Sequence, residues 1–597
     1  MENEKSKSFW KKPLSGRRLL LIWLILSAAI AVVFAIGGLP TNYAPVEASY
    51  FPGALIISAV CSAIVIGVCK FIHWLYCWRN LKRFFFAVAC LITLIALFYA
   101  EENWRGKHAW KNFKREQEAK GERLDFASIV PPPVPDEQNF AMTPIWVEEI
   151  SANIGVEKGR IWYGGKVAAL GHTNFVRRLL MPVELWDRSG LEFTNKMRGW
   201  QQAEKTDLKA WQEYYRRLAT VTNVFPVPAQ SQTPAEDVLL ALSKYDSTIK
   251  ELRKASQLPY ARFPLTYDTA DPASILLPHL ASLKGCSRTL QLRALAELQA
   301  GQTERAFDDI KLTFRLIESA HTEPTVISQL VRNAMLQIIF QPIWEGLADH
   351  RWTEAQLAAF EAELGKLDFL ADCQAGLHWE RNFAVTMIDY LRGSRNEIKN
   401  IMDFSDKSAT SDSSFQFQLW LAHYAPGGWL ERNKIACCRM SLELLTPIVN
   451  LETRTASPAN AVQATNAGNG IKLSPYNWIT RLMIPGLSRS SEKFARAQSS
   501  VDLARIACAL ERYRLAHGGF PESLDPLTPQ FIEKIPHDVI GGQPLHYHRT
   551  DDGQFVLYSI GWNEKDDGGI VALTKGRETE YNTDYENGDW VWRYPAK

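Results

Sequence analysis

Apolar residues are concentrated in three uncharged runs within the first hundred positions, 19–38, 51–69 and 84–100. A helix rises about 1.5 Å per residue, so about 20 apolar residues cross a hydrocarbon core of about 30 Å. A charge at mid-bilayer costs about 2.5–3.5 kcal/mol, and runs without charge therefore predict three transmembrane helices rather than buried core helices. A cleaved signal peptide is the alternative for the first run, although its apolar core usually spans about 7–15 residues.

Basic residues flank these runs unevenly. The amino-terminal tail carries six Lys and Arg residues, the connection before the third run carries Arg79, Lys82 and Arg83, and the connection at 39–50 carries none. Because cytoplasmic loops are enriched in Lys and Arg, we expect a cytoplasmic N-terminus and, after three spans, an extracytoplasmic location for everything beyond residue 100. Basic residues at 105–115 argue against this orientation, but long domains cross membranes largely regardless of charge.

Beyond the third run, apolar residues recur at helical spacing. A charged helix with several aromatic residues is expected over 101–123, and a proline-rich, extended linker over 126–145. Residues 146–225 show no clear pattern. The capping patterns Thr233–Glu236 and Thr353–Gln356 each begin a helix, and we expect a helical-hairpin domain over 226–450.

One hairpin of this domain has a recognisable pattern. The segment LAELQAGQTERAFDD, residues 295–309, has small residues where two helices would cross closely, and it resembles a single tetratricopeptide-type hairpin. That resemblance implies a concave, peptide-binding face. A stable solenoid needs about three or more such repeats, so an ordinary helical bundle remains the alternative. Residues 451–474 are polar and of low complexity, and we expect them to be a linker.

The C-terminal residues 475–597 carry the most specific pattern. A helix is expected from about 492 to 517 with one apolar face, and two strands flank the turn Asp551-Asp552-Gly553. Over residues 494–569 this layout resembles the globular α+β part of G-type pseudopilins of type II secretion. The residues that carry the resemblance are Tyr513, Gly518, Phe520, Pro521, Pro536, Asp538, Pro544, Tyr547, Tyr558, Ser559, Gly561, Gly568 and Gly569.

The departures from that family limit what the resemblance implies. No prepilin cleavage motif precedes the helix, and residues 537–542 replace the family's Pro-Trp-Gly turn, so only the fold is implied and not filament formation. Such pseudopilins bind calcium near their last loop. The oxygen ligands here would be Asn563, Glu564, Asp566 and Asp567, and a solvated acidic turn is the alternative.

The chain as a whole resembles uncharacterised bacterial inner-membrane proteins that share the stretch PPPVPDEQNFA, residues 131–141. This resemblance implies no activity and no cofactor. With 67 basic and 65 acidic residues, the net charge of +2 gives no support to a nucleic-acid partner. The 46% apolar and 22% charged composition excludes a mainly disordered chain.

Candidate chemistry is sparse. The motifs of zinc proteases, serine hydrolases and nucleotide-binding loops do not occur in the sequence. His546 and His548 alternate on a predicted strand without an evident third ligand, so an exposed strand face is favoured over a metal pair. An odd number of cysteines lies beyond the membrane runs, which favours buried thiols but leaves a disulfide open. These cysteines are Cys286, Cys373, Cys437, Cys438 and Cys508.

These patterns together predict a mainly α protein. Three transmembrane helices would anchor a large helical-hairpin region and a small pseudopilin-like α+β module outside the inner membrane. The function we expect is non-enzymatic: interaction with a protein of the envelope or of a secretion assembly, next to the lipid bilayer. Two alternatives remain. One is an envelope hydrolase with an unrecognised site, and the other is a carbohydrate-binding protein that uses exposed rings among its 20 tryptophans.

Overall fold

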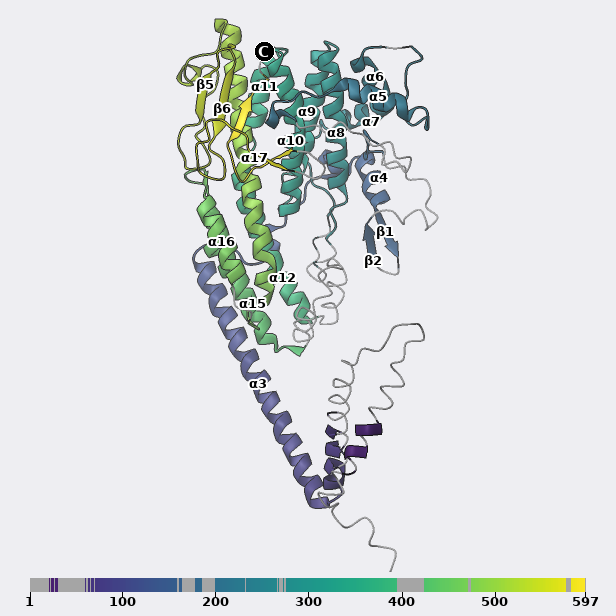
Figure 1. Ribbon diagram of the computed structural model, residues 1–597, viewed down its shortest axis with the longest axis vertical. Coiled ribbons are helices and arrows are strands. Elements are labelled where there is room, and N and C mark those ends of the chain that lie inside the picture. Colours follow the sequence, from purple (N-terminus) through teal and green to yellow (C-terminus); the bar gives the residue numbers. More distant parts are fainter. Residues whose placement is uncertain are drawn as a thin grey trace, which may run out of the picture. The chain divides into compact units, whose positions relative to one another are not determined.

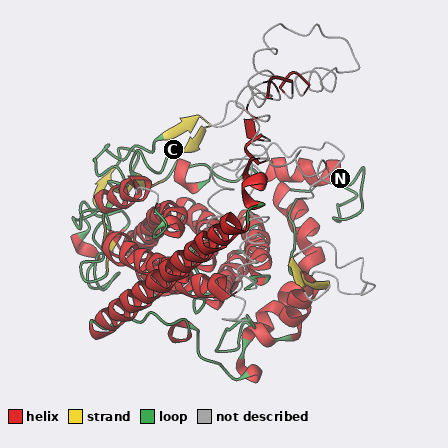
Figure 2. Cartoon of the chain, turned by 90° about the horizontal axis from the view of Figure 1, so that it is seen from below, coloured by secondary structure: helices red, strands yellow, loops and turns green. Residues whose placement is uncertain are grey.

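The chain divides into two compact units, Met1–Glu101 and Glu102–Lys597, in a computed structural model. The residues that the structure describes are 70–157, 160–163, 178–184, 199–230, 232–265, 267, 272, 275–393, 424–470, 474–575 and 581–595, with short stretches between 21 and 68. Helices dominate this part of the chain, and the strands are few and short (Figures 1 and 2). The predicted mainly α class is therefore confirmed.

Among the described residues, one helix is long and apolar enough to cross a membrane. This helix, α3, runs from Trp78 to Ala119 and contains the apolar run 84–100. No side chain of its apolar window is buried, as expected for a surface that faces lipid. The predicted spans 19–38 and 51–69 lie largely outside the described residues. The charged stretch that follows the apolar run continues the same helix.

From Glu102 onward α3 belongs to the second unit, and this part of the helix packs closely against α15, Gly427–Met440. A Cβ atom added to Gly106 would lie 2.3 Å from the carbonyl oxygen of Gly428, so both glycines are needed for this approach. The buried carboxylate of Glu102 accepts hydrogen bonds from Trp429 Nε1 at 3.0 Å and from the Tyr476 hydroxyl at 3.2 Å. Two aromatic side chains therefore satisfy a charge that burial would otherwise penalise.

The helices described for the second unit are joined by connections of very different length. After α3 they are α4 Pro144–Asn153, α5 Leu208–Leu218, α6 Pro234–Leu242, α7 Asp246–Ala255, α8 His279–Gln299, α9 Thr303–Ser319, α10 Val326–Ala348, α11 Glu354–Gly365, α12 Phe369–Gly393, α15, α16 Pro458–Gly470 and α17 Trp478–His517. Helix α17 lies among α10, α11, α12, α15 and α16, and it also packs against the C-terminal strands (Figure 1).

Helix α17 is longer and more deeply buried than its pattern predicts. It begins at Trp478 rather than near residue 492, and its residues from Phe494 to Leu510 are buried on almost every side. The expected single apolar face is therefore wrong. Small residues make this possible, because Ala497, Ala504 and Ala507 let neighbouring helices approach closely on several sides. Gly518 then ends the helix with φ 84°.

The C-terminal sheet has the order β5-β6-β9. Strands β5 His546–Arg549 and β6 Phe555–Ser559 form the predicted antiparallel hairpin, and β9 Trp590–Arg593 pairs with the other edge of β6. The buried carboxylate of Asp538 accepts hydrogen bonds from Ser559 Oγ at 2.7 Å and from the amides of Ile540 and Ile560. The other strands form three pairs. They are β1 Ile154–Glu157 with β2 Arg160–Tyr163, β3 Val449–Asn450 with β4 Thr455–Ala456, and β7 Leu573–Lys575 with β8 Tyr581–Thr583.

The linker predicted over 451–474 is wrong for most of its length. Its residues form the hairpin β3–β4 and then α16, which packs along α17. Ala461 and Ala464 are buried, and Thr465 Oγ1 lies 2.9 Å from Ser488 Oγ on α17. Alanine, glycine and asparagine gave this segment its low-complexity appearance, but the small side chains are what allow two helices to lie close together.

The linker predicted over 126–145 is also part of the folded body. Phe140 and Ala141 are completely buried, and the backbone amide of Phe140 donates to the carbonyl of Tyr260 at 2.8 Å. The side-chain amide of Asn139 donates to the Arg262 carbonyl, and its oxygen accepts a hydrogen bond from the Arg262 backbone amide. The prolines at 131–133 and 135 are exposed or half-buried, whereas the residues after them form two short 3-10 turns and take further backbone partners from 260–262. The unassigned region 146–225 contributes α4, α5 and the pair β1–β2.

The described residues of 226–450 are mainly helical, as predicted. Both capping boxes are present, at Thr233 with Glu236 and at Thr353 with Gln356. Helices α8 and α9 form the expected hairpin, and α10 packs against both of them. Helix α11 instead packs mainly on α17, which gives a layered bundle rather than one uniform stack of hairpins. The loop at 405–414 lies outside the described residues.

A buried group of charges joins α7, α8 and α9. Asp309, on the inner face of α9, accepts hydrogen bonds from Arg253 of α7 and, at 3.0 Å, from Arg293 of α8. Arg293 also pairs with Asp246 and lies 3.4 Å from the carboxylate of Glu297. Burial raises the pKa values of Asp309 and Glu297, whereas the arginines oppose that rise. The buried carboxylate of Asp309 thus holds three helices in register.

Substituting Asp309→Ala should therefore strongly destabilise the second unit. Removing one member of a buried ion pair costs about 3–5 kcal/mol, because Arg293 stays buried with one anionic partner fewer. The neighbouring Asp308 is exposed, and Asp308→Ala should change the free energy of unfolding by less than about 0.5 kcal/mol. Urea denaturation of both variants measures the difference, and similar losses in the two would contradict this account.

Candidate functional site

A groove runs along α9. It has a volume of about 580 Å³, and the C-terminal ends of α7 and α11 form its two walls. Asp308, Lys311, Arg315 and Glu318 recur at helical spacing along its floor. Its volume lies within the range of small-molecule pockets, about 300–1,000 Å³, but such pockets are mostly apolar, whereas this lining carries charges of both signs, which favours a polar segment of another protein. We call it the α9 groove.

Charges of both signs line the α9 groove. Lys311 and Lys366 project from the floor and one wall, and Glu363 lies 2.8 Å from the Lys366 ammonium group. Arg315 is held in place, since its guanidinium donates to the carbonyls of Ser256 at 3.3 Å and Leu258 at 2.6 Å. Such a mixed, solvated lining can orient a polar partner, whereas it offers no enclosed reaction chamber.

A second hollow, of about 280 Å³, lies where α11, α17, the β3–β4 hairpin and residues 533–539 meet. Asp502 of α17 is at its base and is 7% exposed. Its Oδ1 atom accepts a hydrogen bond from Gln498 Nε2 at 3.2 Å. The neighbouring cations have partners of their own, because Arg505 pairs with Glu361 and Arg454 pairs with Asp368.

Burial dominates the protonation of Asp502. It raises the pKa of this carboxyl group to about 7, even though Arg505 and the Gln498 amide act in the opposite direction. A carboxyl group that titrates near neutrality is a feature of many acid–base catalysts, and also of purely structural buried acids. The residues that line this hollow include no Ser, Thr or Cys, so it supplies a potential base without a hydroxyl or thiol nucleophile beside it.

Two further spaces are too small for a substrate. One of about 20 Å³ lies beside Glu380, Ser441, Cys437 and Thr480, and burial raises the pKa of Glu380 to about 7. The Cys437 sulfur lies 3.2 Å from Thr480 Oγ1. A volume of this size admits about one water molecule, so these groups have no room for a ligand.

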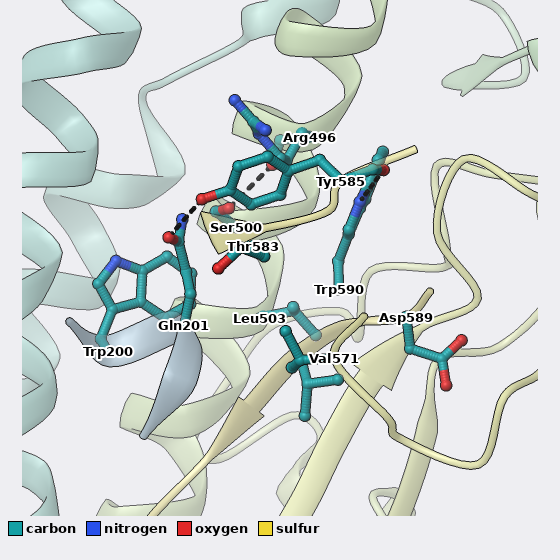
Figure 3. A pocket seen from close by; sticks show the side chains of 11 residues that line it. Trp200, Gln201, Arg496, Ser500, Leu503, Val571, Thr583, Tyr585, Asp589 and Trp590 are labelled. Carbon is teal, nitrogen blue, oxygen red and sulfur yellow. Dashed lines mark hydrogen bonds between the residues drawn. The ribbon is translucent and has the colours of Figure 1, made fainter. Parts of the chain in front are cut away.

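The other space is the junction between the C-terminal sheet and the helices (Figure 3). There Tyr585 donates a hydrogen bond to Gln201 Oε1 at 2.5 Å, and Trp590 Nε1 donates to the Tyr585 carbonyl at 3.2 Å. The Arg496 guanidinium of α17 lies 3.6 Å from the centre of the Tyr585 ring. These contacts enclose about 20 Å³, so the junction is a packed joint rather than a binding site.

The predicted calcium loop is closed by hydrogen bonds within the protein. Asp566 Oδ1 accepts from the Tyr558 hydroxyl at 3.0 Å and from the Gly568 amide at 2.9 Å, and Asn563 Nδ2 donates to Asp567 Oδ2 at 3.0 Å. The described residues contain no group of three or more His, Cys, Asp or Glu side chains placed to hold a metal ion. The calcium site, Glu564 included, thus remains a prediction.

Sequence reasoning did not foresee the partners of this loop. Asp589, which follows 20 residues later, accepts a hydrogen bond from the Gly569 amide at 2.7 Å. His546 stacks on the ring of Tyr558 and lies 3.5 Å from Asp566, while His548 meets the same ring edge-on. The two histidines thus share one face of β5, as predicted, and their contacts there are with an aromatic ring. No short sequence motif could have linked Asp589 to this loop.

The remaining candidates are mostly buried. Five cysteines are free thiols within the body, namely Cys286, Cys373, Cys437, Cys438 and Cys508. Burial raises the pKa of the Cys437 thiol to about 11, which keeps it protonated and unreactive. Of the tryptophans beyond residue 100 whose exposure is described, Trp104 alone is exposed. These positions therefore provide no platform of coplanar, exposed rings for a carbohydrate.

Comparisons with protein-family models, with curated proteins and with solved structures find no match to this chain. Function is therefore inferred from the residues and their geometry alone.

The burial of Asp502 predicts a specific dependence of stability on pH. In the unfolded chain the carboxyl pKa is about 3.9, so a native pKa near 7 means that folding takes up a proton between these values. The stabilisation is fully present below pH 4 and is lost as the pH rises through 7. Asp502→Asn should remove this loss, making the variant more stable than the parent at pH 8 by about 2–4 kcal/mol, with no difference at pH 4.

Chemical denaturation at several pH values measures this difference. Asp308→Asn, at an exposed position of α9, serves as the matched control and should not alter the pH profile. A variant at position 502 whose profile parallels that of the parent would show that this carboxyl group titrates normally.

Proposed function

We propose that this protein is a non-enzymatic inner-membrane protein that presents an extracytoplasmic interaction region to a protein of the bacterial envelope. The observation that carries the proposal is the α9 groove, an open hollow of about 580 Å³ on the folded body. Its lining combines charged residues of both signs with Leu312, Phe314 and Leu367. Such a surface is suited to holding a segment of another protein.

Membrane anchoring is supported by α3 and by the two apolar runs that precede it. Helix α3 has a charge-free run of 17 residues, 84–100, followed directly by the charged stretch that enters the second unit. The runs 19–38 and 51–69 have the length and composition of further spans. The distribution of Lys and Arg supports a cytoplasmic N-terminus, and three spans would then put the second unit outside the cytoplasm.

A role in a secretion or envelope assembly is supported by the C-terminal module. Several residues that resemble the pseudopilin pattern have evident structural tasks: Gly518 ends α17 with a positive φ, Asp538 is buried with three donors, and the Tyr547 hydroxyl donates to the Pro521 carbonyl at 2.6 Å. A long helix packed on a small antiparallel sheet is consistent with that resemblance. The contribution of this module would be structural and recognitional rather than catalytic.

A hydrolase is the second candidate, favoured by one observation. Asp502 lies in a hollow of about 280 Å³, and its carboxyl pKa is raised to about 7. A general base could act there on a bound water molecule. The interaction role is the better supported of the two, because the hollow has neither a hydroxyl nucleophile nor an unpaired arginine to stabilise a developing charge.

Reporter fusions test the proposed topology. Alkaline phosphatase joined after residue 120, just beyond the end of α3 at Ala119, should be active, because the enzyme requires an oxidising compartment for its disulfides. β-Galactosidase joined at the same position should be inactive. The opposite pattern of activities would place the second unit in the cytoplasm.

Site-specific photo-crosslinking tests the interaction role of the α9 groove. A photoreactive residue at position 311, on the groove floor, should give one defined adduct in intact cells. The matched control is position 213, which is exposed on α5 and should not give that adduct. Lys366→Glu reverses a charge on the groove wall and should weaken capture about tenfold, equivalent to about 1.4 kcal/mol. Equal capture from positions 311 and 213 would contradict a specific groove.

A further inference from the structure

Helix α3 changes character directly after its apolar run. The run ends at Ala100, and from Asn103 to Arg115 the helix carries five Lys and Arg residues and no acidic residue. Four exposed side chains of this stretch share one face, because positions three and four apart are neighbours on a helix. We call this face the α3 outer face, and its residues are Trp104, Lys107, His108 and Lys111.

The opposite face of the same turns packs into the second unit. The Oδ1 atom of Asn103 accepts a hydrogen bond from the Gly428 amide at 2.8 Å. The Glu102 carboxylate accepts hydrogen bonds from Trp429 and Tyr476. The start of α15 and the residues just before α17 therefore lie beside the first turn of α3 that follows the apolar run. This end of the second unit is fixed close to the point where the apolar run ends.

Trp104 is the aromatic member of the α3 outer face. It is 68% exposed and stacks on His108, with the ring centres 5.6 Å apart. Tryptophan is enriched at membrane–water interfaces, where its ring contacts lipid and its N–H group stays near water and headgroups. Trp104 follows Ala100 by four residues, which is about 6 Å along the helix axis. Since the headgroup layer is about 5–8 Å thick, this ring lies at headgroup depth when the apolar run spans the hydrocarbon core.

The two lysines of the α3 outer face have no anionic partner among the described residues. Lys114, one position further along the chain than this face extends by a turn, differs in this respect because Glu118 lies 3.6 Å away. Lys107 and Lys111 are four positions apart, and like charges at that spacing repel each other on a helix. Helical side chains lean toward the N-terminus, which directs both ammonium groups back toward the apolar run. An anion at the end of that run would offset the repulsion.

We propose that the α3 outer face binds the headgroups of anionic phospholipids in the leaflet at which α3 leaves the membrane. The Trp104 ring lies between the acyl chains and the headgroups, and Lys107 and Lys111 donate hydrogen bonds to lipid phosphate groups. Lipid is the partner because the face is continuous with the apolar run and its positive charge is complementary to an anionic surface.

This inference rests on the membrane anchoring in the proposed function and adds the lipid class that the anchor recognises. It applies to either leaflet, because anionic lipid attracts these lysines on both sides of the membrane. It also assigns a task to the basic residues after the third apolar run, which positive-inside counting alone would place in the cytoplasm.

Photo-crosslinking to lipid tests the depth of the α3 outer face. p-Benzoylphenylalanine at position 104 replaces one aromatic side chain with another, and the full chain is placed in nanodiscs of equal parts phosphatidylcholine and phosphatidylglycerol. Mass spectrometry should find adducts with phospholipid. The matched control is position 115, which is exposed on the same side of α3 about 16 Å further along the helix and should give no lipid adduct.

The lipid composition of these adducts tests the two lysines. Position 104 should capture phosphatidylglycerol at least about fivefold more often than phosphatidylcholine, because each lysine near an anionic surface contributes about that factor. Lys107→Gln together with Lys111→Gln should bring the ratio to about one, whereas Arg115→Gln should leave it unchanged. Loss of the preference on adding inorganic phosphate would show that the lysines take a free anion, and would overturn the inference.

A probe at Ile92, which is exposed within the apolar run, separates this inference from the anchoring on which it rests. Lipid adducts at position 92 with none at 104 would overturn the inference and leave the membrane anchor intact. The absence of lipid adducts at position 92 would remove the anchor itself. Equal lipid capture at positions 104 and 115, equal capture of the two lipids, or capture of a protein in place of lipid at 104 would each overturn the inference alone.

Discussion

Burial of α17 on nearly all its sides is the constraint on which the second unit depends. A helix that is apolar on one face can end a layer, but a helix covered on every side must lie at the centre. Five helices and the C-terminal strands reach its surface because alanine, serine and cysteine occupy most of its crossings. The helical region and the α+β module therefore share one core, and 102–597 form a single compact unit.

Buried charge adds specificity to this packing. Asp309 holds α7, α8 and α9 together, and Arg332 on α10 donates to Asp372 on α12 at 2.5 Å. Moving such charges out of water costs free energy, and this cost is offset only where each charged side chain meets its counter-ion. A different arrangement of the same helices would leave these groups unpaired. The α9 groove lies along α9, between the C-terminal ends of α7 and α11.

Features of this chain that depend on neighbouring residues could be predicted from the sequence, whereas features built from distant residues could not. Capping boxes, the hairpin turn at Asp551–Gly553 and the charged end of α3 depend on residues a few positions apart, and all of them could be predicted. The α9 groove could not, since its walls belong to α7 and α11 and its floor to α9. Residues 451–474 were misassigned because small, polar residues are typical of linkers as well as of closely packed helices.

The sequence by itself determined the helical class, the apolar run of α3, the helix starts at Thr233 and Thr353 and the β5–β6 hairpin, because local spacing and turn chemistry are sufficient for them. Only the tertiary structure decided that α17 is central, that Asn139, Phe140 and Ala141 just after the proline-rich stretch are part of the core, and that Leu179 and Met181 lie on α8. The physical reason is that burial and backbone hydrogen bonding depend on partners a hundred or more residues away, which no local pattern records.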